Sequence, residues 1–198
     1  MSWSWCNRRP WGNLMEGFLV STGVVAFAEV GDKTQLLALV LATRYRKPVP
    51  ILLGILLATL LNHALAGAVG GWLAGVFDAD TIRIALGLSF VGMAVWTLFP
   101  DRYEEQDTRP PRWGVFAATL LAFFLVEMGD KTQVATCAFA ARYADFRAVV
   151  AGSTLGMMLA NVPVVLLGQA ASTRVPIKVM RIVAALLLLT VGVAVLVT

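Results

Sequence analysis

The stretch EVGDKTQLLALVLATRYRK (29–47) decides the fold, because it recurs later in the chain as EMGDKTQVATCAFAARYAD (127–145). The two stretches share nine identical residues in 19 positions. The register continues beyond them without a gap, so that Gly54, for example, aligns with Gly152. An alignment that holds over this length indicates a tandem duplication of one structural unit.

The composition around the repeat is that of a membrane protein. The chain has 198 residues, of which 59% are hydrophobic and 14% are charged, whereas soluble domains are about 45–50% apolar and about 25% charged. These values exclude a soluble domain, a disordered chain and a disulfide-stabilised scaffold, and they predict a polytopic membrane protein. The two cysteines, Cys6 and Cys137, do not have the spacing of metal ligands.

The charge distribution fits the same class. The net charge is +4, and the Lys and Arg residues lie in short groups between apolar runs, as the positive-inside rule predicts for membrane proteins. The sequence has no basic face with interleaved aromatic residues, so we expect no binding to nucleic acid.

Six long apolar stretches are each expected to form a transmembrane helix, since about 20 residues cross the ~30 Å hydrocarbon layer. The stretches are roughly 17–43, 49–77, 84–99, 113–141, 148–173 and 182–198. The first and fourth stretches are long and contain charges. We therefore expect them to be tilted, kinked or broken, with Gly31 and Gly129 as the points of interruption.

The duplicated unit contains three of these helices, an odd number, so the second unit enters the membrane from the opposite side. This predicts an all-α membrane protein with six transmembrane helices arranged as two inverted three-helix repeats, the architecture of many secondary transporters. The chain divides into an N-terminal tail or upstream extension (1–14), a first three-helix repeat (15–100), a polar linker (101–113) and a second three-helix repeat (114–198).

The positive charges also predict the orientation of the chain in the membrane. The loops that follow the first, third and fifth predicted helices carry nine Lys and Arg residues, and the opposite side carries five. By the positive-inside rule, both termini face away from the cytoplasm. We expect a multi-pass protein of a bacterial inner (plasma) membrane.

Each E-φ-G-D-K-T-Q motif places three charges near the bilayer midplane, where one charge costs about 2.5–3.5 kcal/mol on insertion scales. One interpretation is structural: Glu29 and Lys33, four residues apart on a helix, neutralise each other. That pairing leaves Asp32 over, and Asp130 in the second motif likewise, so a functional role is favoured.

The four acids of the motifs predict a site for a divalent cation. Residues at i and i+3 share one helix face, and the pseudo-symmetry axis brings the two faces together. Oxygen ligands without His or Cys suit hard cations such as Mn²⁺, Ca²⁺ or Mg²⁺. The expected metal ligands are Glu29, Asp32, Glu127 and Asp130.

The other polar residues of the motifs are expected to support this site. Four carboxylates without a cation repel one another, so at least one holds a proton that an arriving metal ion expels. This couples the transported cation to protons, with no permanently bound cofactor. The supporting residues are Thr34, Gln35, Thr132 and Gln133, which add oxygen atoms, and Lys33 and Lys131, which compensate charge when the metal leaves.

Three further polar residues lie within predicted helices: Asn62 and His63 in the second, and Asn161 in the fifth. His63 and Asn161 occupy equivalent positions of the two repeats. The main interpretation of His63 is a hydrogen-bonded packing residue, and the alternative is a role in gating or proton relay.

With its two E-φ-G-D-K-T motifs on a duplicated three-helix unit, the chain resembles the family of Golgi and thylakoid manganese/calcium–proton exchangers and, most closely, their bacterial manganese exporters. The resemblance covers residues 15–198. It implies six helices, cation/proton antiport, and metal binding by the motif acids, which are Glu29, Asp32, Glu127 and Asp130 here. It is the resemblance that favours Mn²⁺ as the exported ion.

Three alternatives stay open at this point. The first is a Ca²⁺/H⁺ exchanger, since the acids do not distinguish Ca²⁺ from Mn²⁺. The second is a membrane scaffold or channel subunit that transports nothing by exchange. The third is an intramembrane protease with paired aspartates, which the identical acids and the lysines of both halves disfavour, so we expect no enzyme. The sequence leaves a homo-oligomer open.

Overall fold

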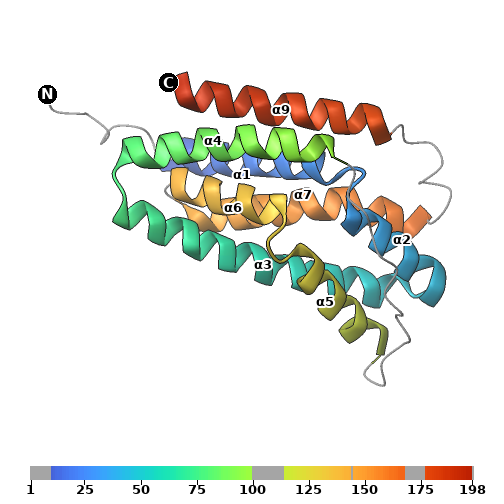
Figure 1. Ribbon diagram of the computed structural model, residues 1–198. Coiled ribbons are helices and arrows are strands. Elements are labelled where there is room, and N and C mark those ends of the chain that lie inside the picture. The colour runs from blue at the N-terminus through green and yellow to red at the C-terminus, as the bar shows by residue number, and fades with distance from the viewer. Residues whose placement is uncertain (1–9, 100–113, 144, 168–176, 198) are drawn as a thin grey trace, which may run out of the picture.

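The computed structural model describes residues 10–99, 114–143, 145–167 and 177–197, and within these ranges it is helical with no strand (Figure 1). The linker 101–113 lies outside the described residues. The helices are α1 (Pro10–Glu29), α2 (Lys33–Tyr45), α3 (Pro48–Val76), α4 (Ala79–Leu98), α5 (Gly114–Glu127), α6 (Lys131–Arg142), α7 (Phe146–Leu167) and α9 (Ile177–Val197).

The interruptions expected at the two motif glycines are confirmed. Gly31 and Gly129 have φ angles of 80° and 77°, a left-handed conformation that ends a helix and that glycine adopts without steric penalty. The chain then re-enters a helix at the following aspartate, because Asp32 caps α2 and Asp130 caps α6 with extended backbones. Between α1 and α2 the helix axis bends by 70°.

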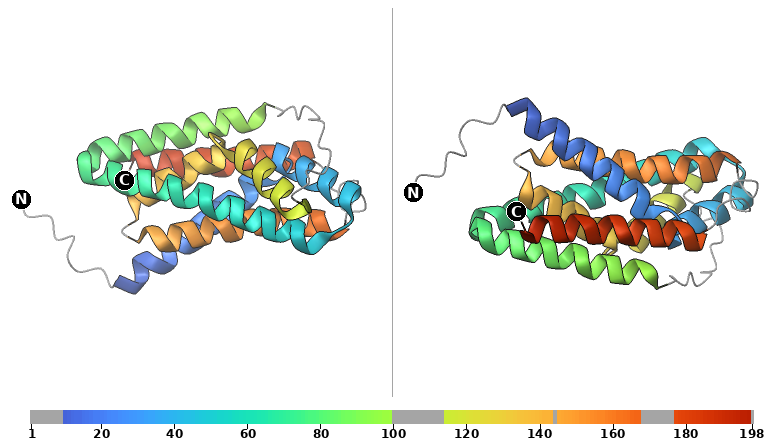
Figure 2. Two further views of the ribbon diagram at one scale, coloured as in Figure 1. Left: turned by 90° about the horizontal axis from the view of Figure 1, so that it is seen from below. Right: turned by 90° about the horizontal axis from the view of Figure 1, so that it is seen from above.

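Corresponding helices of the two halves run in opposite directions along the bundle. In Figure 1, α1 begins at the left end and α5 at the right, and α3 and α7 are reversed in the same way. The helices pack mainly across the halves: α1 lies against α7, α3 lies against α5 and α6, and α4 lies against α9. Both views of Figure 2 keep α4 and α9 side by side along one flank.

Close contacts repeat between the two cross-half packings. A side chain at Gly54 of α3 would strike Thr119 and the Phe116 carbonyl of α5. Its counterpart Gly152 in α7 would strike Ser21 and the Phe18 carbonyl of α1, which are the corresponding positions of the first half. The α3–α5 and α7–α1 packings therefore share one register.

Three of the described helices are long and apolar enough to cross a membrane: α3, the Asp80–Leu98 part of α4, and α7. The bent pair of α1, from Leu14, and α2 is a fourth candidate, while α5 and the Ile182–Val197 part of α9 are shorter apolar helices. These are up to four candidate spans, compared with the six expected.

The described surface is apolar where a soluble protein would be polar. On α3, the leucines Leu53, Leu57 and Leu61 are exposed, whereas Thr59 and Asn62 are buried. Such a distribution fits a helix that contacts lipid on its outer face and keeps its polar groups inside the bundle.

The α3–α6 contact gives a first prediction. A Cβ atom at Gly70 would overlap the Cys137 carbonyl oxygen of α6, whereas one at Gly71 meets no atom within 4 Å. We expect Gly70→Ala to destabilise the bundle by about 1–3 kcal/mol through overpacking, and Gly71→Ala to leave its stability unchanged. Thermal unfolding of the two purified variants in detergent compares them, and equal melting temperatures would contradict the packing described.

Candidate metal site

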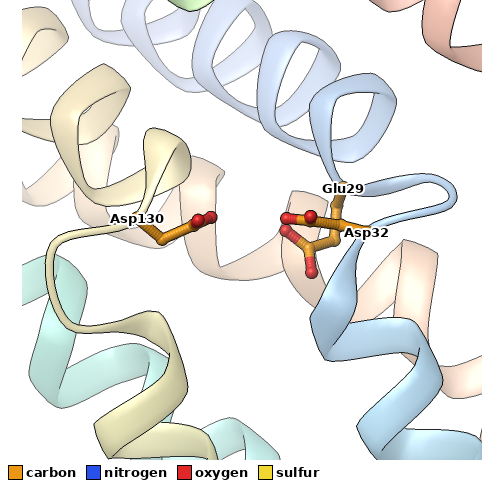
Figure 3. A group of neighbouring side chains, drawn as sticks. All are labelled: Glu29, Asp32 and Asp130. Carbon is orange, nitrogen blue, oxygen red and sulfur yellow. The ribbon is translucent and has the colours of Figure 1, made fainter. Parts of the chain in front are cut away.

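The two helix breaks bring three carboxylates together in the centre of the bundle. Glu29 and Asp32 come from the first break and Asp130 from the second, and each offers an oxygen within 4.8 Å of the others. In Figure 3 the Asp130 carboxylate points at the other two across the gap between the breaks. All three side chains are at most 1% exposed. The structure thus assembles three of the four predicted acids into one cluster.

The two motif lysines bind the aspartates of the opposite halves. Lys33 Nζ lies 2.8 Å from Asp130 Oδ1, and Lys131 Nζ lies 3.0 Å from Asp32 Oδ1. The two lysines, expected to compensate charge at the site, therefore contact the cluster directly. These crossed ion pairs also give Asp32 and Asp130 the partners that pairing within one helix could not give them.

The helix-face argument for the cluster needs a correction. Glu29 is the last residue of α1, and Asp32 lies beyond the break at the start of α2. The two residues therefore do not share a face of one continuous helix, and neither do Glu29 and Lys33. They meet because the left-handed Gly31 turns the chain back on itself. Glu127 and Asp130, which lie on either side of Gly129, likewise do not share one continuous helix.

Glu127, the fourth predicted ligand, is held at the edge of the site by α3. Thr59 Oγ1 donates a hydrogen bond of 2.9 Å to Glu127 Oε1, and Asn62 Nδ2 donates one of 3.1 Å to Glu127 Oε2. Sequence reasoning included Asn62 but missed Thr59. A usable signal was present, since Thr59 lies three residues before Asn62 and therefore on the same face of the helix.

Glu29 has no such donors, because the repeat is not exact at these positions. In the shared register of the two packings, the counterparts of Thr59 and Asn62 are Met157 and Ala160 of α7, whose side chains cannot donate a hydrogen bond. Both carboxylate oxygens of Glu29 are buried without a hydrogen-bond partner among the described residues. They are the oxygens of the cluster most available to a cation.

The two motif glutamines shape the breaks. Gln35 Oε1 accepts a hydrogen bond of 2.8 Å from the Gly31 backbone N–H, and Gln133 Oε1 accepts one of 2.7 Å from the Gly129 N–H. Gln35 also donates to the Ala160 carbonyl of α7 at 2.9 Å. In this structure the amide oxygens are engaged by the backbone, so the glutamines position the acids.

The remaining predicted residues lie around the cluster with differing contacts. Thr132 Oγ1 lies 3.5 Å from Asp130 Oδ2, and Thr34 Oγ1 is buried without a hydrogen-bond partner in the described chain. His63 Nδ1 lies 3.5 Å from Thr154 Oγ1 of α7, and its Nε2 has no described partner. Asn161 Nδ2 donates to the Met157 carbonyl and lies 3.1 Å from its sulfur. Neither His63 nor Asn161 contacts the three acids by a described hydrogen bond.

The cluster has the ligand chemistry of a site that could hold a divalent cation. The cluster offers only oxygen ligands, which suit hard cations. With all groups ionised, three carboxylates face two ammonium groups, which leaves one excess negative charge. A cation that binds the aspartates must compete with Lys33 and Lys131 for the same oxygens. The positive N-terminal ends of α2 and α6 begin at these aspartates and attract negative charge there.

The glutamine contacts give a second prediction. Gln35 joins its break to α7 as well as to Gly31, whereas Gln133 bonds only Gly129 among the described residues. Leaving a buried polar group without a partner costs about 1–3 kcal/mol. We therefore expect Gln35→Leu to lower the melting temperature in detergent more than Gln133→Leu does. An equal or larger loss for Gln133→Leu would contradict the role assigned to the Ala160 contact.

Comparison with known proteins identifies the family. The model of the divalent cation/proton antiporter GDT1 family matches residues 17–105 and 115–198. A protein of Vibrio cholerae described as "Putative manganese exporter" is 47% identical over 95% of this chain and 94% of its own length. GDT1-like proteins of Synechocystis and Arabidopsis thaliana are 26% and 24% identical over 88% and 94% of this chain, and 93% and 98% of their own lengths. No solved structure matches the chain. The chain belongs to the GDT1 family of divalent cation/proton antiporters.

Proposed function

We propose that this protein exports Mn²⁺ from the cytoplasm in exchange for protons. The observation that carries the proposal is the buried cluster of Glu29, Asp32 and Asp130, whose oxygens converge from both helix breaks. Membership of an antiporter family and the similarity to the Vibrio cholerae protein support the same reading and favour Mn²⁺. Ca²⁺, another hard cation that prefers oxygen ligands, is the second candidate ion.

In this proposal Glu29, Asp32 and Asp130 bind the transported ion, and Glu127 is the fourth acid, held at the edge of the site. Lys33 and Lys131 bind the two aspartates when the metal ion has left, so that only one negative charge of the cluster then remains without a cation partner. Protons that enter from the acidic side neutralise carboxylates and thereby release the ion on that side. When no metal ion is bound, the carboxylates of the site are then either paired with a lysine or protonated.

We further propose that the chain forms two inverted three-helix repeats, 15–100 and 114–198, with six membrane crossings. The opposite directions of α1 and α5 and the shared register of the α3–α5 and α7–α1 packings support this arrangement. Each broken pair, α1 with α2 and α5 with α6, then counts as one crossing. In this proposal the protein spans a bacterial inner membrane. The excess of positive charge in one set of loops predicts that both termini lie outside the cytoplasm.

The shared site gives a third prediction. Asp32→Asn and Asp130→Asn each remove a charge that the proposed site needs, so each variant should lose Mn²⁺ export to the background rate in inverted membrane vesicles. The matched control is Asp80→Asn, which removes an exposed carboxylate paired with Arg83 at the surface. Normal export by either site variant would contradict the shared-site proposal.

These variants leave a lysine without its aspartate, which could by itself unfold the protein. The double change Asp32→Asn with Lys131→Met removes both members of one ion pair and keeps the charge balance. We expect this variant to fold, as judged by a single symmetric peak in size-exclusion chromatography, and still not to export.

The coupling to protons gives a fourth prediction. With the membrane voltage clamped at zero, collapse of the pH gradient should stop Mn²⁺ accumulation against its own gradient, because uphill exchange is driven by the protons that bind the carboxylates and release the ion. Vesicles loaded with Ca²⁺ in place of Mn²⁺ test the second candidate ion. Uphill metal transport that continues without a pH gradient would contradict the coupling to protons. Downhill metal flux that moves no protons in exchange would indicate a channel subunit, and absence of any flux would favour a scaffold.

A further inference from the structure

The two motif glutamates precede the same Gly-Asp-Lys-Thr-Gln sequence at the same distance but have different partners in the structure. Glu127 accepts hydrogen bonds from Thr59 and Asn62 of α3, and its oxygens are not part of the three-acid cluster. Glu29 accepts no hydrogen bond from the described part of the chain and belongs to the cluster. The cause of this difference lies outside the motifs, because the motifs themselves match at every charged position.

The difference follows from two positions at which α3 and α7, the unbroken helices beside the breaks, carry different residues. In the register that aligns Gly54 with Gly152, Met157 and Ala160 of α7 correspond to Thr59 and Asn62 of α3. The two α7 residues therefore face α1 as the two α3 residues face α5. The Ala160 carbonyl accepts from Gln35, which confirms that this part of α7 lies beside the first break. On α7 a thioether and a methyl group thus take the positions from which, on α3, a hydroxyl and an amide bind Glu127.

We propose that Thr59 and Asn62 are positioning residues that set metal affinity by withholding Glu127 from the ion. Glu127 lies outside the three-acid cluster, so its carboxylate must move away from Thr59 and Asn62 to reach the ion. That movement costs hydrogen bonds to a charged group, which are about twice as strong as neutral ones. The site therefore takes Mn²⁺ with three carboxylates and keeps a fourth in reserve. A site of four free carboxylates would bind the ion more tightly and release it more slowly. This inference rests on the proposed function.

The test measures Mn²⁺ affinity of the full-length protein in detergent by titration calorimetry at mildly alkaline pH, where protons compete least. Thr59→Val removes the donor and keeps the shape of the side chain, and Thr59→Ser keeps the donor. We expect Thr59→Val to bind Mn²⁺ about tenfold more tightly, equivalent to about 1.4 kcal/mol, and Thr59→Ser to bind like the wild type.

The reciprocal change is made on α7. Met157→Thr introduces a hydroxyl where Thr59 has one in the other half, and Met157→Val is its control of the same shape without a hydroxyl. We expect the Thr variant to bind Mn²⁺ about tenfold more weakly than the Val variant, because the hydroxyl would hold Glu29 away from the ion; about tenfold corresponds to about 1.4 kcal/mol. If the α7 variants do not fold, the Thr59 pair decides alone.

A double-mutant cycle separates withholding of Glu127 from a general change in packing. Glu127→Gln alone should weaken Mn²⁺ binding less than Glu29→Gln does, and it should remove the gain of affinity that Thr59→Val produces. Thr59→Val binding that is unchanged or weaker than wild type, or a gain that survives Glu127→Gln, would overturn the inference. If the wild-type protein binds no Mn²⁺, the proposed metal site itself is overturned. If the wild type binds Mn²⁺ but the two variants of each matched pair bind it with equal affinity, only this inference is overturned.

Discussion

Charge balance inside an apolar bundle is the constraint on which the rest of this structure depends. Five ionisable side chains, three acids and two lysines, meet where the described helices are otherwise apolar on their outer faces. An unpaired buried charge is costly, and each half of the chain leaves its aspartate to be paired by a lysine of the other half. Neither half forms this centre alone, which gives a physical reason for the cross-half packing of α1 on α7 and of α3 on α5 and α6.

The helix breaks make the crossed pairs geometrically accessible. A continuous helix would carry Glu29, Asp32 and Lys33 past the centre on its own surface, whereas the left-handed Gly31 starts a new helix at Asp32 with a 70° bend. The positive N-terminal end of that new helix attracts the negative charge of the aspartate. Gln35 bonds the backbone of the break and fixes it to α7. Shape and charge are therefore set by the same seven-residue motif.

Helices α3 and α7 give the site its asymmetry. Duplication predicts equal roles for Glu29 and Glu127, yet α3 presents donors to one glutamate and α7 presents apolar groups to the other. An exchanger needs a site that binds its ion and also lets it go, since affinity and release oppose each other. Divergence at a few positions of α7 and α3 adjusts this balance without changing the motifs, whose aspartates and lysines the charge balance holds in place.

The membrane class, the duplication, the two breaks and the three acids that cluster were predictable from the sequence, because hydropathy, glycine conformation and charges in apolar stretches are local properties of the chain. It could not determine which lysine pairs with which aspartate, since that depends on the approach of two breaks 98 residues apart. Nor could it separate Glu29 from Glu127, because their difference arises from neighbours on other helices. Only the tertiary structure decided these partners, as contacts between helices are fixed by packing and not by the local pattern of either helix.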